Sequence, residues 1–274
     1  MYAKDFYFGD QLLSEFGFMI CTLGTESGTV EYSAGSEITF NTVKRNYGKS
    51  YSLAGTSYDT CVSAEFIIAK DPCFYGYNSH ITNDEFRDIQ RWLNRKEFLP
   101  FRLLHRHEPW CDPCFYDVSF NIEKIMFADV LCAIKLTLFS DSPYGYGETI
   151  SQTFDIDSSN DYLYMDISDE IGYIYPNVEI TCKSAGVLKI KNSLFPDETV
   201  EVKGCSLNEV ITINGEIMSI NSSKSSHDIS NDFNYTFLKI GNTYEDIKNV
   251  YYVGDGGIPC RVKISYKPII KDSP

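Results

Sequence analysis

The sequence has little positive charge and no long apolar run. Its 24 Lys and Arg residues stand against 38 Asp and Glu residues, which gives a formal net charge of −14. A nucleic-acid-binding surface needs clustered Lys and Arg to neutralise phosphates, and anionic membrane surfaces attract the same residues. No uninterrupted apolar stretch approaches the roughly eighteen residues of a membrane span. The composition therefore argues against specific nucleic-acid binding and against membrane partners.

The sequence also lacks the pattern of a secretion signal, because its opening, MYAKDFYFGD, places acidic residues where a signal peptide has an apolar core. We therefore expect a protein that is made in the cytosol, stays soluble and keeps its thiols reduced. The nine cysteines are scattered and odd in number, which disfavours a disulfide scaffold.

Motifs of catalysis are missing as well. The chain contains no G-x-S-x-G, Walker A or H-E-x-x-H pattern. The carboxylate groups Asp155/Asp157 and Asp166/Asp169/Glu170 lie in polar, turn-like stretches without the spacing of a calcium loop. We therefore predict no catalytic residues, no cofactor and no enzymatic activity.

The sequence is rich in aromatic residues and in stretches where apolar and polar residues alternate. It contains 20 Tyr and 18 Phe, and both residue types favour the half-buried surface of a sheet. In FYDVSFNI (115–122) apolar and polar residues alternate, as in a strand with one buried face. Similar patterns predict strands at residues 62–69, 133–139, 187–192, 198–204 and 260–267. The fold class is therefore mainly β.

One helix and one boundary interrupt this pattern. Residues 82–96 form the predicted helix, which opens with Thr82 and Glu85 at capping-box spacing. Its apolar stripe, from Phe86 to Leu93, is expected to cover a sheet. Pro, Gly and Ser interrupt the strands in SDSPYGYGET (140–149). We therefore predict two domains, 1–140 with the helix and 141–274 with short strands in a sandwich.

The segment HRHEPWCDPC (105–114) is the densest cluster of candidate site residues. His105 and His107 would share one face of a strand, and Cys111 and Cys114 have the spacing of a zinc knuckle. A lone ten-residue site is unusual for structural zinc, whose ligands generally come from two separated segments. The four residues remain metal candidates.

Other chemistry at this segment is less well supported. A thioredoxin-like pair needs its second cysteine in a helix, whereas Cys114 runs into a predicted strand. A cysteine nucleophile would need a partner histidine, and no motif selects one. Pro109 and Pro113 instead mark a turn between two strands. We therefore interpret the segment as the tip of a β-hairpin, with Trp110 as a candidate contact with another subunit or a neighbour.

The order of these features resembles the distal tail protein (Dit) family of long non-contractile-tailed bacteriophages. The opening FYFGDQLLSEFGFMI (6–20) is similar to the start of that family, and RWL (91–93), then LPFRLL, then FYDVSFNI resemble its first domain. DFNYTFLKIGNT (232–243) and CRVKISYKP (260–268) resemble the last strands of its second domain. The sequence departs from the family at 105–114, where a short polar turn is usual, and after Asn242.

The resemblance implies a β-sandwich or barrel-like first domain that forms a hexameric ring and a galectin-like sandwich as the second domain. Such a ring sits at the distal end of the virion's tail. It joins the tail tube protein to a tail-associated hub or lysin protein, with receptor-binding proteins as further partners. DNA would pass through the ring, and an acidic lumen would repel its phosphates.

A second hypothesis is a carbohydrate-binding sandwich module of a host-adhesion device, because exposed aromatic side chains can stack on sugars. The two hypotheses differ in the expected assembly state. A ring requires a stable hexamer, whereas a binding module can act as a monomer.

Overall fold

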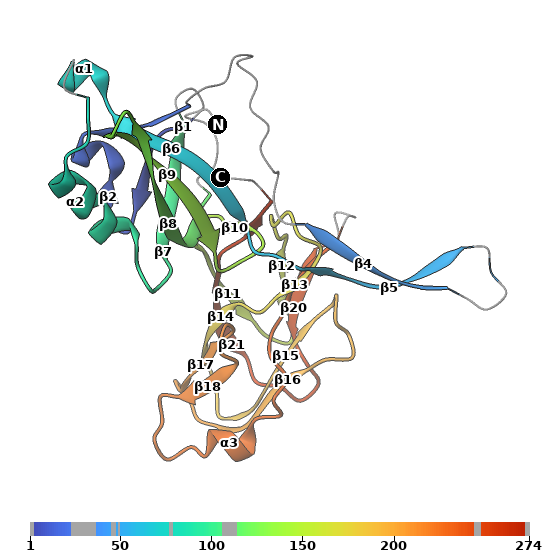
Figure 1. Cartoon of the computed structure of the whole chain (residues 1–274). Coiled ribbons are helices and arrows are strands. Elements are labelled where there is room, and N and C mark those ends of the chain that lie inside the picture. Colours follow the sequence, from blue (N-terminus) through green and yellow to red (C-terminus); the bar gives the residue numbers. More distant parts are fainter. Residues whose placement is uncertain are drawn as a thin grey trace. The chain divides into compact units, whose positions relative to one another are not determined.

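The computed structural model describes residues 3–22, 37–44, 48, 50–76, 79–105, 114–243 and 248–271. The chain divides into two compact units, unit 1 with Met1–Gly147 and Ile270–Pro274 and unit 2 with Glu148–Ile269. The last residues thus group with unit 1, whereas the sequence placed them in the second domain. Both units consist mainly of strands, as predicted (Figure 1). Within the described ranges, no helix is long and apolar enough to cross a membrane.

Unit 1 is built on a seven-stranded sheet with the order β2-β1-β7-β8-β9-β6-β3. Consecutive strands β7, β8 and β9 pair antiparallel. The strands of the sheet are β1 (Ala3–Phe8), β2 (Gln11–Leu12), β3 (Phe18–Cys21), β6 (Ser63–Lys70), β7 (Leu99–His105), β8 (Tyr116–Phe127) and β9 (Val130–Ser140). Unit 1 further contains β4 (Ile38–Lys44), β5 (Tyr51–Tyr58) and β10 (Gly145–Tyr146), and β22 (Ile269–Ile270) lies at the division between the units.

This sheet curls around an aromatic core. Three strands separate β1 from β6, so in a flat sheet their side chains would lie about 19 Å apart. The ring centroids of Phe6 in β1 and Phe66 in β6 are only 5.6 Å apart. Phe101 and Phe120, from the intervening strands, also contact Phe6. The sheet is therefore strongly rolled, which agrees with the barrel-like first domain that was expected.

The predicted helix is α2 (Asn83–Leu93). The Thr82 hydroxyl accepts a bond from the Glu85 amide at 3.3 Å, and the Glu85 carboxylate accepts one from the Thr82 amide at 2.8 Å, so the predicted capping box is present. The helix ends three residues earlier than predicted. Its apolar stripe packs into the core of unit 1, where Trp92 stacks on Phe6 with 5.6 Å between ring centroids. The stripe therefore covers the sheet, as expected.

Three short helical segments were not predicted: η1 (Leu13–Phe16), a 3-10 helix; α1 (Pro72–Tyr75); and α3 (Ile229–Asp232). Each has four residues, too few for an apolar stripe to show in the sequence. The first two lie in unit 1 and the third in unit 2.

Unit 2 is a sandwich of two antiparallel sheets, with the orders β11-β21-β14-β17-β18 and β12-β20-β15-β16. Its core joins alternate residues of both sheets, such as Ile180 and Val262 from the first and Leu188 and Tyr251 from the second. The strands are β11 (Ile150–Ile156), β12 (Tyr162–Tyr164), β14 (Asn177–Cys182), β15 (Gly186–Asn192), β16 (Val200–Cys205), β17 (Val210–Asn214), β18 (Ser219–Ser222), β20 (Asn249–Val253) and β21 (Cys260–Tyr266), and a small separate sheet pairs β13 (Gly172–Ile174) with β19 (Ile240–Asn242).

Candidate functional site

The hairpin formed by β4 and β5 is the first candidate interaction site. Among the described strands, these two, β4 and β5, pair only with each other (Figure 1). Residues that lie opposite each other in the ladder share a face, so Ile38 and Phe40 in β4 lie on the same side as Leu53 and Tyr51 in β5. The exposed fractions of these four side chains are 42%, 63%, 60% and 64%, respectively. We call this side the apolar hairpin face.

The exposure of four apolar side chains to water is unfavourable for the stability of a two-stranded hairpin. An isolated hairpin is only marginally stable in water unless an apolar face packs against something. Adjacent exposed apolar side chains also mark surfaces that bind other proteins. The apolar hairpin face therefore has the properties of a contact surface.

The sequence-predicted metal candidates are only partly described. His105 is the last residue of β7, where its backbone pairs with Ala3, and Cys114 lies half-buried just before β8. His107, Cys111 and Trp110 lie outside the described residues. The two flanks of the segment, β7 and β8, are adjacent antiparallel strands, with Leu99 opposite Val118. In the part of the chain that the structure describes, no group of three or more His, Cys, Asp or Glu side chains is placed to hold a metal ion.

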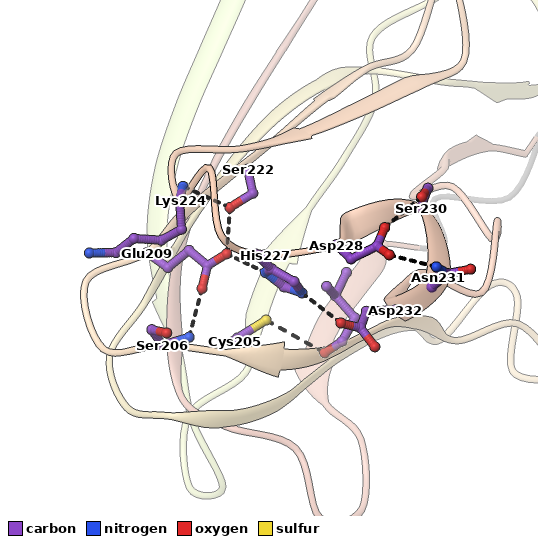
Figure 2. Close-up of polar contacts among 11 residues, drawn as sticks. Cys205, Ser206, Glu209, Ser222, Lys224, His227, Asp228, Ser230, Asn231 and Asp232 are labelled. Atoms are coloured by element: carbon purple, nitrogen blue, oxygen red, sulfur yellow. Dashed lines mark hydrogen bonds and ion pairs between the residues drawn. The ribbon is translucent and has the colours of Figure 1, made fainter.

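A buried polar cluster in unit 2 was not singled out in the sequence (Figure 2). Glu209 lies at the end of the turn between β16 and β17, where the neighbouring Asn208 adopts a left-handed conformation with φ of 60°. The Glu209 side chain is fully buried. Its carboxylate accepts hydrogen bonds from the Ser206 amide at 2.7 Å and from the Ser222 hydroxyl.

His227 completes this cluster. Its Nδ1 contacts the Glu209 carboxylate, and its Nε2 lies 3.2 Å from Oδ2 of Asp232 in α3 (Figure 2). A general base needs one ring nitrogen directed at the group that it deprotonates. Here both ring nitrogens face carboxylates. The arrangement is therefore typical of a structural ion-pair network, which holds the 223–232 segment against β16 and β17.

Charge and burial act in opposite directions on this cluster. Burial alone lowers the pKa of His227, but the hydrogen bond and negative charge of Glu209, with smaller effects of Cys205 and the Lys203 carbonyl, raise this pKa above its ordinary value of 6.5. Burial alone raises the pKa of Glu209, but bonds from Ser222, His227 and Ser206 lower it below 4.5. Folding therefore favours the charged form of both groups.

These shifts predict how the stability of unit 2 depends on pH. Because the pKa of His227 is raised by folding, its contribution is complete below pH 6.5 and is lost as the pH rises through the raised pKa. Because the pKa of Glu209 is lowered, its contribution is present above pH 4.5 and is lost as the pH falls through the lowered pKa. Urea unfolding of the wild type and of His227→Gln between pH 5 and pH 9 measures the effect.

The His227→Gln variant should lack most of the loss on the alkaline side. The groups facing His227 are Glu209, Asp232 in α3 and Cys205 at the end of β16, with Asp228 nearby. Parallel pH profiles for variant and wild type would contradict the assignment to His227.

Sequence reasoning missed both sites for different reasons. The strand pattern around Phe40 is visible in the sequence. Nothing in that pattern shows that β4 and β5, among the described strands, join none of the larger sheets. His227 lies in a polar stretch, 221–232, without a strand or helix pattern. Its contact with Glu209 spans 18 residues, and no motif links the two positions.

Comparisons with known proteins define the class of this chain. A family model described as phage tail protein N-terminal domain matches residues 1–142, and one described as phage tail C-terminal domain matches residues 144–266. The protein is therefore a phage tail protein. It belongs to the family that these two domain models define, and the predicted kinship with phage tail proteins is confirmed. No curated protein matches the chain significantly.

One solved structure shows the same fold. The chain is similar to the Dit protein of phage SPP1, described as a paradigm of the hub adsorption apparatus in phages that infect Gram-positive bacteria. The identity is 8%, the TM-score is 0.65, and the match covers 96% of this chain and 98% of the other. A chain of the phage P2 baseplate, in its activated conformation with Ca, matches at 11% identity over 97% and 98% with a TM-score of 0.45. The two-unit fold is thus that of Dit, as the sequence indicated.

Proposed function

We propose that the protein is a structural, non-enzymatic component of the tail tip that assembles into a hexameric ring. In this role the ring joins the tail tube to a hub or adhesin protein at the distal end of the virion and lets DNA pass. The observation that supports the proposal most strongly is the apolar hairpin face, which is exposed and which no other described strand of the chain pairs with. The Dit fold over almost the whole chain supports the same role.

The net charge of −14 supports the DNA conduit. An acidic protein repels phosphates, so DNA would slide past it without sticking. We propose that Trp110 and its neighbours at 105–114 act as a contact with a ring neighbour. The antiparallel pairing of β7 with β8 supports the hairpin interpretation on which this proposal rests.

Mass measurement of the purified full-length chain tests the ring. We expect a particle of six times the 31.2 kDa chain mass in light scattering or mass photometry. Phe40→Glu places a charge on the apolar hairpin face and should shift the particle towards the monomer, because a desolvated charge without a partner opposes association.

Val43→Glu is the matched control. Val43 has an exposed fraction of 57% and lies on the opposite face of the same strand, since alternate residues of a strand point to opposite sides. This variant should keep the wild-type mass. A monomeric wild type at micromolar concentration would refute the ring.

A further inference from the structure

Tyr162 and Tyr164 of β12 pack against the core. Beyond them, the polarity is inverted in the segment that leads from β12 to β13. Leu163 in β12 and Met165 and Ile167 after it alternate and are exposed to 58%, 48% and 61%, respectively. Between and after them, Asp166 and Ser168 are buried, each with an exposed fraction of 8%. Strands at a protein surface normally show the reverse pattern, with apolar residues inside. The inversion therefore needs a cause.

A buried hydrogen-bond network fixes this inversion. The Tyr266 hydroxyl donates to Oδ1 of Asp166 at 2.6 Å, and the Ser168 hydroxyl donates to the same oxygen at 3.1 Å. The Ser168 oxygen in turn accepts a bond from the Ile269 amide at 3.1 Å. A shift of one residue would turn the apolar side chains inward, but it would break all these bonds. The apolar residues are thus held outward.

The exposed side chains continue into β13. Ile171 and Tyr173 have exposed fractions of 36% and 53%. We call the five residues Leu163, Met165, Ile167, Ile171 and Tyr173 the apolar stripe. Its neighbours in the sequence are mainly acidic, because positions 157–171 contain four Asp or Glu besides the buried Asp166 and no Lys or Arg. One cation, Lys239, lies 4.5 Å from the ring centroid of Tyr173. Within the described part of its sheet, β12 pairs only with β20 and lies at the edge.

The apolar hairpin face has the complementary character. Positions 44–49 contain three Lys or Arg and no Asp or Glu, in a chain whose acidic residues outnumber its basic ones, while Glu37 and Asp59 flank the other ends of the two strands. Among the described residues, Lys44 lies on the same face as Tyr51, with its Nζ 6.0 Å from the ring centroid. Opposite charges around two apolar surfaces favour their association and set its orientation.

We propose that the apolar hairpin face of one copy docks on the apolar stripe of unit 2 in a neighbouring copy. The two surfaces differ, so the contact is head-to-tail, and head-to-tail contacts generate rings when the rotation closes. This proposal rests on the self-association proposed above and adds the surface that receives the hairpin.

Site-specific photo-crosslinking locates this contact. With p-benzoylphenylalanine in place of Phe40, irradiation of the assembled full-length chain should give covalent dimers on a denaturing gel. Mass spectrometry should place the link within residues 161–173. The same probe at Val43, on the opposite hairpin face, should give at least severalfold fewer dimers. Links from Phe40 that stay within one chain, or dimers linked elsewhere, would overturn the proposal.

The second measurement compares the association of variants in which a charge is introduced into the apolar stripe or outside it. Ile167→Asp should weaken association about tenfold or more, the usual effect of disrupting a central apolar contact. Leu207→Asp is the matched control, because Leu207 is exposed to 56% in unit 2 outside the stripe. A wild type that forms hexamers while Ile167→Asp and Leu207→Asp assemble equally well would refute the stripe and leave the ring intact. A monomeric wild type would refute the ring itself.

Discussion

Replacing Phe6 by alanine is expected to destabilise unit 1 by about 3–5 kcal/mol, the usual cost of removing a large aromatic side chain from a core. Phe6 is fully buried, and its ring contacts those of Phe66, Phe101, Phe120 and Trp92. Close packing prevents these neighbours from filling the space, so the loss includes a cavity as well as transfer to water. Urea unfolding followed by circular dichroism, with hydrogen exchange to assign the change to unit 1, measures the effect.

Phe98→Ala is the matched control for this substitution. Phe98 is in the same unit, but half of its side chain surface is exposed, at 50%. Its removal should cost much less. If the two variants unfold at the same urea concentration, the rolled sheet does not depend on the aromatic core in the way that the ring contacts imply.

Replacing His227 by leucine is expected to destabilise unit 2 by about 3–5 kcal/mol, the cost of removing one partner from a buried ion pair. The substitution leaves the buried carboxylate of Glu209 with the Ser206 amide and the Ser222 hydroxyl only. Removing both charges should be less harmful than removing one. The double variant Glu209→Leu/His227→Leu is therefore expected to recover part of the loss in urea unfolding at pH 6.

His80→Leu provides a control for the histidine substitution, because His80 is exposed in unit 1. Its stability should stay within about 0.5 kcal/mol of the wild type. A double variant that is less stable than His227→Leu alone would show that Glu209 does not depend on its charged partner.

The strands and the long helix could be predicted from the sequence because their signals are local. The alternation in FYDVSFNI corresponds to β8, and the capping box of Thr82 and Glu85 marks the first turn of α2. The sequence does not mark the end of this helix, because Asn94 and the residues after it are compatible with another helical turn. The structure ends it at Leu93.

The candidate sites depend on contacts between distant positions, which periodicity does not encode. Tyr266 holds Asp166 from 100 residues away, and this bond decides which side of the β12 segment faces outward. The acidic residues of that segment were interpreted as solvated loop charges. For Asp166 the interpretation was wrong, because its side chain is almost completely buried.

The two hydrophobic cores of the described chain share no side chain: one belongs to unit 1 and the other to unit 2. A genetic crossover between Gly147 and Glu148 would therefore keep each core within one parent, although it would also exchange β22, which pairs with β10 of unit 1. We expect the aromatic core of unit 1 to fold after such an exchange, because all of its side chains come from residues before the crossover. What an exchange would have to preserve is the match between one copy's hairpin and the next copy's stripe, so the surfaces, rather than the cores, limit which halves are compatible.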